Sequence, residues 1–376
     1  MRLFRTWFCR VMFLLALLSL ASPALAQTSG RPFRVAYLEG GPFSDYQRIL
    51  KGVAVGLQRA GVIENGNVPI PADSEAAAPM WQWLSRHAGG SGVVFVEDAF
   101  YSSDWDADWR AEVTEKLLRR IREKGDIDMI LAFGTWAGQD LAAADIDVPV
   151  VVTSVTNAVE AGIIPSVESS GRDNLVASIE PDRYKQQVIL FHNIFNFKKL
   201  GIAYEDTPSG RSSVSLGEIE SAARELNVEL VRCTDTFDVA DPLLAASRLK
   251  VCHENLVQQG AEAVYLTLNI GMQPGTIADV LSPLVNAFLP TFSQTGQSEV
   301  EHGALLSISQ VNTEEEGVFT AQQMVAIMNG AKPGMLNQIY EGVVSLALNL
   351  RTATRIGWNP SLELLAAVDR FYQDMK

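Results

Sequence analysis

Apolar residues along the chain follow two alternating spacings. Short, mostly apolar runs at residues 34–38, 127–133 and 148–153 are typical of strands buried on both faces of a parallel sheet. Between such runs, residues 46–60 and 111–124 carry apolar side chains on one side only, which predicts amphipathic helices. This alternation of strand and helix predicts a doubly wound parallel sheet.

The second half of the chain repeats the alternation. We expect strands at residues 199–204, 228–232, 263–266, 289–293, 304–308 and 343–348, and helices at residues 182–193, 214–226, 242–259, 276–287, 313–329 and 360–372. No Ser/Gly-rich linker separates the halves, so we expect the chain to cross near Thr156 and again near residues 289–294. The predicted fold is α/β, with two doubly wound, Rossmann-like lobes joined by a hinge as a clamshell around a ligand.

The first residues carry the pattern of a cleavable signal peptide. Basic residues precede the apolar run of residues 11–20, and Ala24-Leu25-Ala26 forms a small-residue cleavage site. The apolar run is shorter than a membrane-spanning helix requires. We therefore expect cleavage after residue 26 and export of the mature protein to the periplasm.

About 350 residues then remain, a length that favours two domains. We expect a first lobe at residues 31–156 with a return segment at about 291–325. We expect a second lobe at residues 157–290 with a C-terminal segment at about 326–376.

The chain is strongly acidic, with 44 Asp and Glu against 30 Lys and Arg and a net charge of −14. This charge argues against nucleic acid and anionic membrane surfaces as partners. The four histidines do not have metal-ligand spacing, and no P-loop or Gly-x-Ser-x-Gly motif is present. We expect no metal, no cofactor and no catalysis, although a secreted α/β hydrolase is an alternative class that turnover of a bound compound would reveal.

Two cysteines, Cys233 and Cys252, belong to the expected mature chain. In an oxidising compartment they could form a disulfide. Two separate buried thiols fit the sequence equally well.

Candidate binding chemistry follows predicted strands, because ligands of open α/β sheets bind outside the carboxyl ends of the strands. Thr135 is expected to cap a helix over about residues 136–144, where free N–H groups could bind an anion. Capping alone would also explain it. Trp136 could stack on a ligand or pack between helix and sheet. Glu39, at another strand end, could supply a carboxylate.

Residues 98–109 mix aromatic and acidic side chains. They could form a lid or a permease contact. Their acid spacing only partly matches a calcium loop, and a capped helix start explains it better.

Several segments resemble, in order, the tryptophan/tyrosine-type solute-binding proteins of ABC importers. The matching segments read VPVVVTSVTNAVEAGII, GRDNLVA, KLGIAYEDTPSGRSS, MNGAKPGML and LALNLRTATRIGWNP. The resemblance implies ligand contacts at Phe43, Tyr46, Thr135, Trp136, Thr156, Asn157, Ser212, Ser213, Asn269 and Gln294. It also implies a monomeric periplasmic receptor that delivers a small molecule to a permease in the inner membrane.

Two departures from the family pattern bear on the ligand. The chain has Asn157-Ala158 where the family has Asp-Pro, and Leu268-Asn269 where it has Asp-Asn. Carboxylates that could pair with an ammonium group are therefore missing. This favours an aromatic or carboxylate-bearing small molecule over a plain amino acid. A ligand-sensing subunit for a membrane receptor such as a histidine kinase would have the same pocket and is the alternative function.

Overall fold

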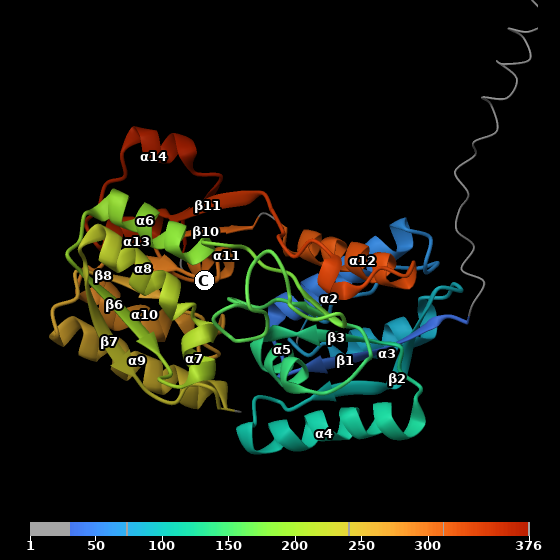
Figure 1. Cartoon of the computed structure of the whole chain (residues 1–376). Coiled ribbons are helices and arrows are strands. Elements are labelled where there is room, and N and C mark those ends of the chain that lie inside the picture. Colours follow the sequence, from blue (N-terminus) through green and yellow to red (C-terminus); the bar gives the residue numbers. More distant parts are fainter. Residues whose placement is uncertain (1–30, 73, 240, 311, 375–376) are drawn as a thin grey trace, which may run out of the picture. The chain divides into compact units, whose positions relative to one another are not determined.

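The computed structural model describes residues 31–72, 74–239, 241–310 and 312–374. The expected signal peptide, residues 1–26, lies outside this part. Within it, the strands form one five-stranded and one seven-stranded sheet, each covered by helices on both faces (Figure 1). The predicted α/β class with two lobes is confirmed.

The sheet of the first lobe is entirely parallel and has the order β2-β1-β3-β4-β5. Its strands are β1 (Phe33–Glu39), β2 (Val93–Ser102), β3 (Met129–Phe133), β4 (Val150–Thr153) and β5 (Leu175–Ala177). Strand β3 shows why continuous apolar runs arise here. Met129 and Leu131 enter the core on one face, whereas Ile130 and Ala132 enter the core on the other.

Helices from distant parts of the sequence cover this sheet. One face carries α2 (Ser44–Arg59), α3 (Ala78–His87) and α12 (Thr313–Met328), and the other carries α4 (Ala107–Lys124) and α5 (Gly134–Ala143) (Figure 1). Two glycines let the backbones of α2 and α12 touch, because no side chain stands between the helices at these positions. A Cβ on Gly52 would overlap the carbonyl oxygen of Glu314, and one on Gly317 would overlap that of Ile49. This contact fixes the late segment of the chain to the first lobe.

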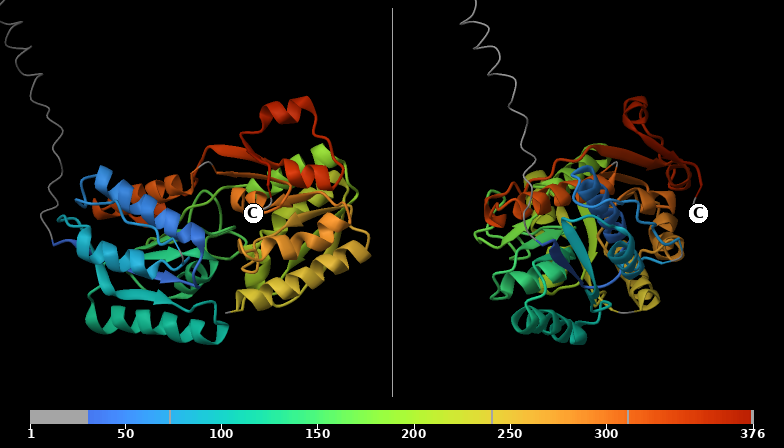
Figure 2. Two further views of the ribbon diagram at one scale, coloured as in Figure 1. Left: turned by 180° about the vertical axis from the view of Figure 1, so that it is seen from behind. Right: turned by 90° about the vertical axis from the view of Figure 1, so that its right-hand side faces the viewer.

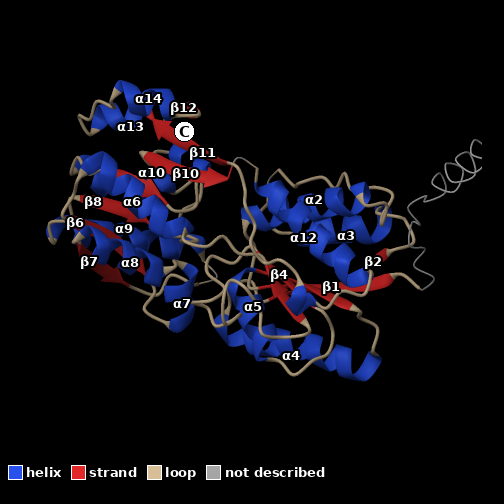
Figure 3. Cartoon of the chain, turned by 45° about the horizontal axis from the view of Figure 1, so that its top comes forward, coloured by secondary structure: helices blue, strands red, loops and turns tan. Residues whose placement is uncertain are grey.

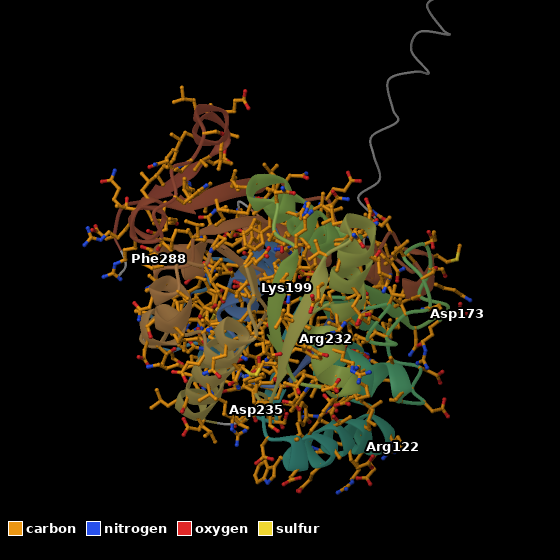
Figure 4. The ribbon with its side chains drawn as sticks, turned by 90° about the vertical axis from the view of Figure 1, so that its left-hand side faces the viewer. Arg122, Asp173, Lys199, Arg232, Asp235 and Phe288 are labelled. Carbon is orange, nitrogen blue, oxygen red and sulfur yellow. A yellow bond between two sulfur atoms is a disulfide. The ribbon has the colours of Figure 1, made fainter. Side chains whose placement is uncertain are left out.

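The sheet of the second lobe has the order β12-β11-β10-β9-β8-β6-β7, in which only β10 and β11 pair antiparallel. Its strands are β6 (Lys199–Tyr204), β7 (Glu229–Thr234), β8 (Ala263–Leu266), β9 (Thr291–Ser293), β10 (Leu306–Gln310), β11 (Val344–Asn349) and β12 (Arg370–Tyr372). Figure 4 labels Lys199 and Arg232 on the neighbouring strands β6 and β7. The edge strand β7 carries charged residues, as exposed edges often do.

Two helical layers also enclose this second sheet (Figure 3). One layer contains α6 (Arg183–Phe195), α8 (Leu216–Leu226) and α13 (Leu350–Arg355), and the other contains α9 (Pro242–Gln258), α10 (Ile277–Asn286) and α11 (Gln297–Glu301). Three short elements complete the chain: α7 (Pro208–Ser213), the 3-10 turn η1 (Pro333–Met335) and α14 (Leu362–Ala367). Helix α14 stands away from the sheet in both views of Figure 2.

Sheet membership moves the expected lobe boundaries. Strand β5 extends the first sheet beyond residue 156, whereas β9 and β10 belong to the second sheet. The chain therefore crosses after β5, returns between β10 and α12, and crosses again before β11. The sequence missed these points because strand pairing, rather than any linker composition, determines them.

The expected last helix is also wrong in its second half. Helix α14 ends at Ala367, and Arg370–Tyr372 then pair with Ala347–Asn349 of β11. An open sheet edge at β11 thus overrides the helical pattern of the sequence.

Cys233 and Cys252 form a disulfide, with their Cα atoms 5.5 Å apart. It joins the end of β7 to α9, which resolves the alternative left open by the sequence. None of the helices in the described part of the chain combines the length and the apolar character needed to cross a membrane.

Candidate ligand-binding site

Strand order locates a binding position in each lobe. In a doubly wound sheet, a crevice opens where the chain reverses its direction of travel across the sheet, outside the carboxyl ends of two adjacent strands. In the first lobe this point lies between β1 and β3, and in the second lobe between β6 and β8.

Four of the predicted contacts lie at the first of these points. Phe43 precedes α2 and meets the Tyr46 ring edge-on, with ring centroids 5.3 Å apart. Tyr46 is 4% exposed, and its hydroxyl reaches Gly134 at the end of β3 so closely that a Cβ there would collide with it. Gly134 has φ +82°, a conformation that suits glycine. Helix α5 begins at this glycine, so Thr135 lies in its first turn. The expectation that Thr135 caps the helix is therefore wrong, because Phe133 occupies the N-cap position.

Protein side chains surround Trp136, the fourth predicted contact. It is 5% exposed, with the Arg110 guanidinium carbon 4.7 Å from its ring centroid and Trp105 packed edge-on at 5.5 Å. Arg110 is held in place by Asp140 at 2.8 Å. This geometry favours packing between α4 and α5 over stacking on a ligand. The adjoining hollow, which Glu39 also lines, is too narrow for a water molecule.

The aromatic and acidic segment before α4 closes over the loop that follows β1. Trp105 has φ +60°, and its Nε1 donates to the Pro42 carbonyl at 2.9 Å. The Asp106 carboxylate accepts from the backbone N–H groups of Asp108 and Trp109. The capped helix start is confirmed, and it explains the acid spacing.

Asn157 joins the loop after β4 to the second lobe. Its Nδ2 donates to Ser215 Oγ and to Glu218 Oε1, both at 3.0 Å. The other Glu218 oxygen accepts from the N–H groups of Tyr184 and Lys185, at 2.9 and 3.1 Å, and so caps α6. An amide fits this position because it can donate to Glu218, whereas an aspartate would repel it. Thr156 lies beside it, partly buried.

The remaining predicted contacts belong to the second lobe and are engaged by protein groups. Asn269 follows β8 and accepts from the Gly271 N–H at 2.8 Å. Gln294 follows β9; its amide donates to the Val214 carbonyl and accepts from the Leu268 N–H. The expected loop before a helix at Val214 is instead the short helix α7, which contains Ser212 and Ser213. Ser212 is fully buried and its hydroxyl donates to the Ser209 carbonyl. It lies at the C-terminal end of α7, where no backbone N–H groups are free for an anion.

The sequence did not predict a charged cluster whose members act on one another electrostatically: Asp45, Arg48, Glu180, Arg183 and Glu316. Glu316, in the first turn of α12, accepts from Thr153 Oγ1 and from the Ser154 N–H at the carboxyl end of β4, both at 2.8 Å. Arg183, the first residue of α6, pairs with Glu180 at 2.7 Å. The cluster thus combines the two lobes.

Burial raises the pKa values of two carboxyl groups in this cluster, Asp45 and Glu316. Burial raises the pKa of Asp45 although 28% of its side chain is exposed, and the charges of Arg48 and Arg183 oppose that rise. Burial likewise raises the pKa of Glu316 to about 7.

Tyr46 connects this cluster to the first predicted position. Burial, followed by the carboxylates of Glu39, Asp45, Asp238 and Glu316, raises the pKa of its hydroxyl. The predicted Tyr46 therefore shares its electrostatic environment with the unpredicted Asp45 and Glu316.

Glu39 differs from these carboxylates because it lies in the core. It is 3% exposed, it accepts from the Tyr37 hydroxyl at 2.7 Å, and burial raises its pKa to about 8. It is therefore mostly uncharged at neutral pH and a poor partner for a ligand cation.

The sequence contained weak signals for the cluster. The run Glu314-Glu315-Glu316 reads as an acidic first turn of a helix, which is favourable without any ligand. Only the packing of α12 on the first sheet shows that Glu316 faces the end of β4. Within the described ranges, no group of three or more His, Cys, Asp or Glu side chains is arranged to hold a metal ion.

Comparison with known proteins agrees with this architecture. The family profile described as ABC transporter substrate binding protein matches residues 104–370. The chain therefore belongs to the family of ABC transporter substrate-binding proteins. A comparison with curated proteins found no significant match.

Solved structures share the fold at low sequence identity. A conserved domain protein from Vibrio cholerae is 20% identical, with a TM-score of 0.67 over 91% of this chain and 100% of that one. An ABC domain from Streptococcus pneumonia, in complex with L-Trp, is 19% identical, with a TM-score of 0.64 over 90% and 99%. A ligand-free, open substrate-binding protein with adhesive properties from Clostridium difficile is 17% identical, with a TM-score of 0.56 over 91% and 100%. These likenesses support the two-lobed, periplasmic-binding-protein-like fold.

Proposed function

We propose that this protein is the receptor of an ABC importer. It binds a small organic molecule between its lobes outside the cytoplasm and delivers it to a permease in the inner membrane. It acts as a monomer in the periplasm and performs no catalysis. The single observation that carries this proposal is the charged cluster, in which Arg183 of the second lobe acts electrostatically on Glu316 of the first lobe at the carboxyl end of β4.

The predicted contacts divide into three groups on this view. Phe43, Tyr46, Thr135 and Asn269 lie at the two positions that strand order favours, and we propose them as ligand contacts. The side chains of Trp136, Asn157, Ser212 and Gln294 make contacts within the protein, which supports a role in shaping the site. Thr156 and Ser213 flank the site, and we keep them as proposed contacts.

A thermal-shift screen of residues 27–376 tests ligand binding. It should contain amino acids, amines, keto acids and hydroxy acids, sugars and purines. A compound that binds only the folded state stabilises it by mass action and so raises the melting temperature. At a ligand concentration of about a hundred times Kd, the stabilisation free energy is about 2.7 kcal/mol. Recovery of the compound unchanged after incubation supports a receptor, and its conversion would contradict one.

Uptake in cells tests delivery. Deletion of the gene should abolish uptake of the compound found in the screen, and the intact gene should restore it. Normal uptake in the deletion strain would contradict the importer role and support a sensing subunit.

A further inference from the structure

The charged cluster has an excess of carboxylates, and its guanidinium groups already have partners. Arg183 pairs with Glu180, and Arg48 pairs with Asp45 at 3.1 Å. Glu316 has no ion-pair partner in the described part of the chain. An anionic ligand would therefore meet no unpaired cation here, whereas a cationic ligand would meet a carboxylate.

Glu316 keeps one carboxyl oxygen for a ligand. Both hydrogen bonds from the end of β4 go to Oε1, from Thr153 and Ser154. Within the described residues, Oε2 makes no hydrogen bond. The side chain is thus held by one oxygen, and the other is left without a partner among the described residues at the carboxyl end of β4, the strand next to β3.

A second observation comes from the other lobe. Glu299 of α11 is 5% exposed, and its Oε2 is buried without a hydrogen-bond partner. Burial raises its pKa to about 7, the Ser293 and Thr295 hydroxyls lower it, and the charge of Asp45 in the first lobe raises it. A buried carboxyl oxygen of this kind is stabilised when a donor reaches it.

Tyrosine rings complete the surroundings. Tyr184 lies under the Arg183 guanidinium, 5.3 Å from its ring centroid. Burial, and then the charges of Glu316 and Glu180, raise the pKa of Tyr340 to about 12. Aromatic faces beside carboxylates favour a cation, and they also provide contact area for an aromatic group.

We propose that the ligand is an organic cation with a positively charged nitrogen and no free carboxylate, and that Glu316 is the carboxylate that receives this nitrogen. Asp45 and Glu299 add negative potential from the two lobes. This inference rests on the proposed function and names its substrate class. It keeps the aromatic part of the expectation from the sequence and replaces the carboxylate-bearing part.

Titration calorimetry with matched compounds at pH 8 tests the proposal. Each set shares one ring system: tryptamine, L-tryptophan and indole-3-propionate, and then tyramine, L-tyrosine and 3-(4-hydroxyphenyl)propionate. Putrescine and spermidine extend the amines to aliphatic cations. An amine should bind at least about tenfold more tightly than its amino acid, and the deaminated acid should not bind. The reason is that one hydrogen bond between charged groups changes the affinity by about a factor of ten or more.

Two glutamate-to-glutamine substitutions in the same helix turn locate the contact. Glu316→Gln should weaken amine binding about ten- to hundredfold while keeping an oxygen for Thr153 and Ser154. Glu315→Gln removes the same charge from the neighbouring exposed residue and should leave the affinity unchanged. Equal melting temperatures of the two variants would exclude a folding defect as the cause.

Three results would overturn the proposal. An amino acid or deaminated acid could bind as tightly as its amine, Glu316→Gln could bind like the unchanged protein, or every amine could fail while another compound of the thermal-shift screen binds. In these cases the receptor function would stand. Failure of every compound in both experiments would count against both proposals.

Discussion

At the scale of single residues, buried carboxyl groups determine how stability depends on pH. The pKa of Glu39 in the folded protein is about 8, compared with an ordinary value of 4.5, because burial penalises its charged form. The folded state therefore holds a proton that the unfolded state has lost between these two values. Stability contributed by Glu39 is present below pH 4.5 and is lost as the pH rises towards 8.

Glu39→Gln should remove this dependence, because glutamine resembles the protonated carboxyl group. We expect the unfolding free energy of the unchanged protein to fall by up to about 1.4 kcal/mol per pH unit from this group within that window. The variant should show a smaller fall in urea unfolding measured from pH 5 to pH 8. An identical slope for both proteins would show that Glu39 is ionised in the folded state.

Asn157 gives a second prediction at this scale, because its amide donates to Glu218. Asn157→Asp should cost about 1–3 kcal/mol of stability at pH 7, since it replaces a donor with a like charge. Asn157→Ala loses the hydrogen bond without adding repulsion and should cost less. A larger loss for alanine than for aspartate, measured by thermal unfolding, would contradict this contact.

At the scale of elements, the sequence predicted most strands and helices but not their partners. Apolar runs such as Lys199–Tyr204 are confirmed as strands because both of their faces are buried in a parallel sheet. Strand β5 is apolar but only three residues long, and β12, also of three residues, is mostly exposed, so both were missed and depend on the edge that a neighbouring strand offers. The same limit applies to the site: Tyr46 and Thr135 follow strand ends in the sequence, whereas Glu316 reaches the site only through packing between distant helices.

The contact between α2 and α12 predicts a strong effect of a very small change. Gly52→Ala should destabilise the protein by about 1–3 kcal/mol, because its methyl group overlaps the backbone of Glu314. Gly275→Ala is the matched control, since open space surrounds a Cβ there and its backbone is not left-handed. Equal urea midpoints for both variants would contradict the close packing of the two helices.

The disulfide gives a further prediction at the scale of elements. It closes a loop across 19 positions of sequence separation, so its removal in a Cys233→Ser, Cys252→Ser double variant should cost about 3 kcal/mol of unfolding free energy. Urea unfolding of the double variant measures this cost. Unchanged stability would show that the link does not constrain the unfolded chain.

At the scale of the whole molecule, the chain passes repeatedly between the lobes through β5, β10 and β11. Such connections suit a hinge, because a few residues at the ends of elements can absorb a rotation. A ligand that contacts both lobes would bind the closed arrangement more tightly and shift the population towards it. The composition of the chain predicted two domains, but only strand pairing shows which segments belong to each.

A crystal structure of the protein with a compound identified by thermal shift tests the central claim most directly. We predict that the compound lies outside the carboxyl ends of β1 and β3 in the first lobe and of β6 and β8 in the second, in contact with Glu316. A compound bound within one lobe, or on an outer face away from these strand ends, would contradict the account.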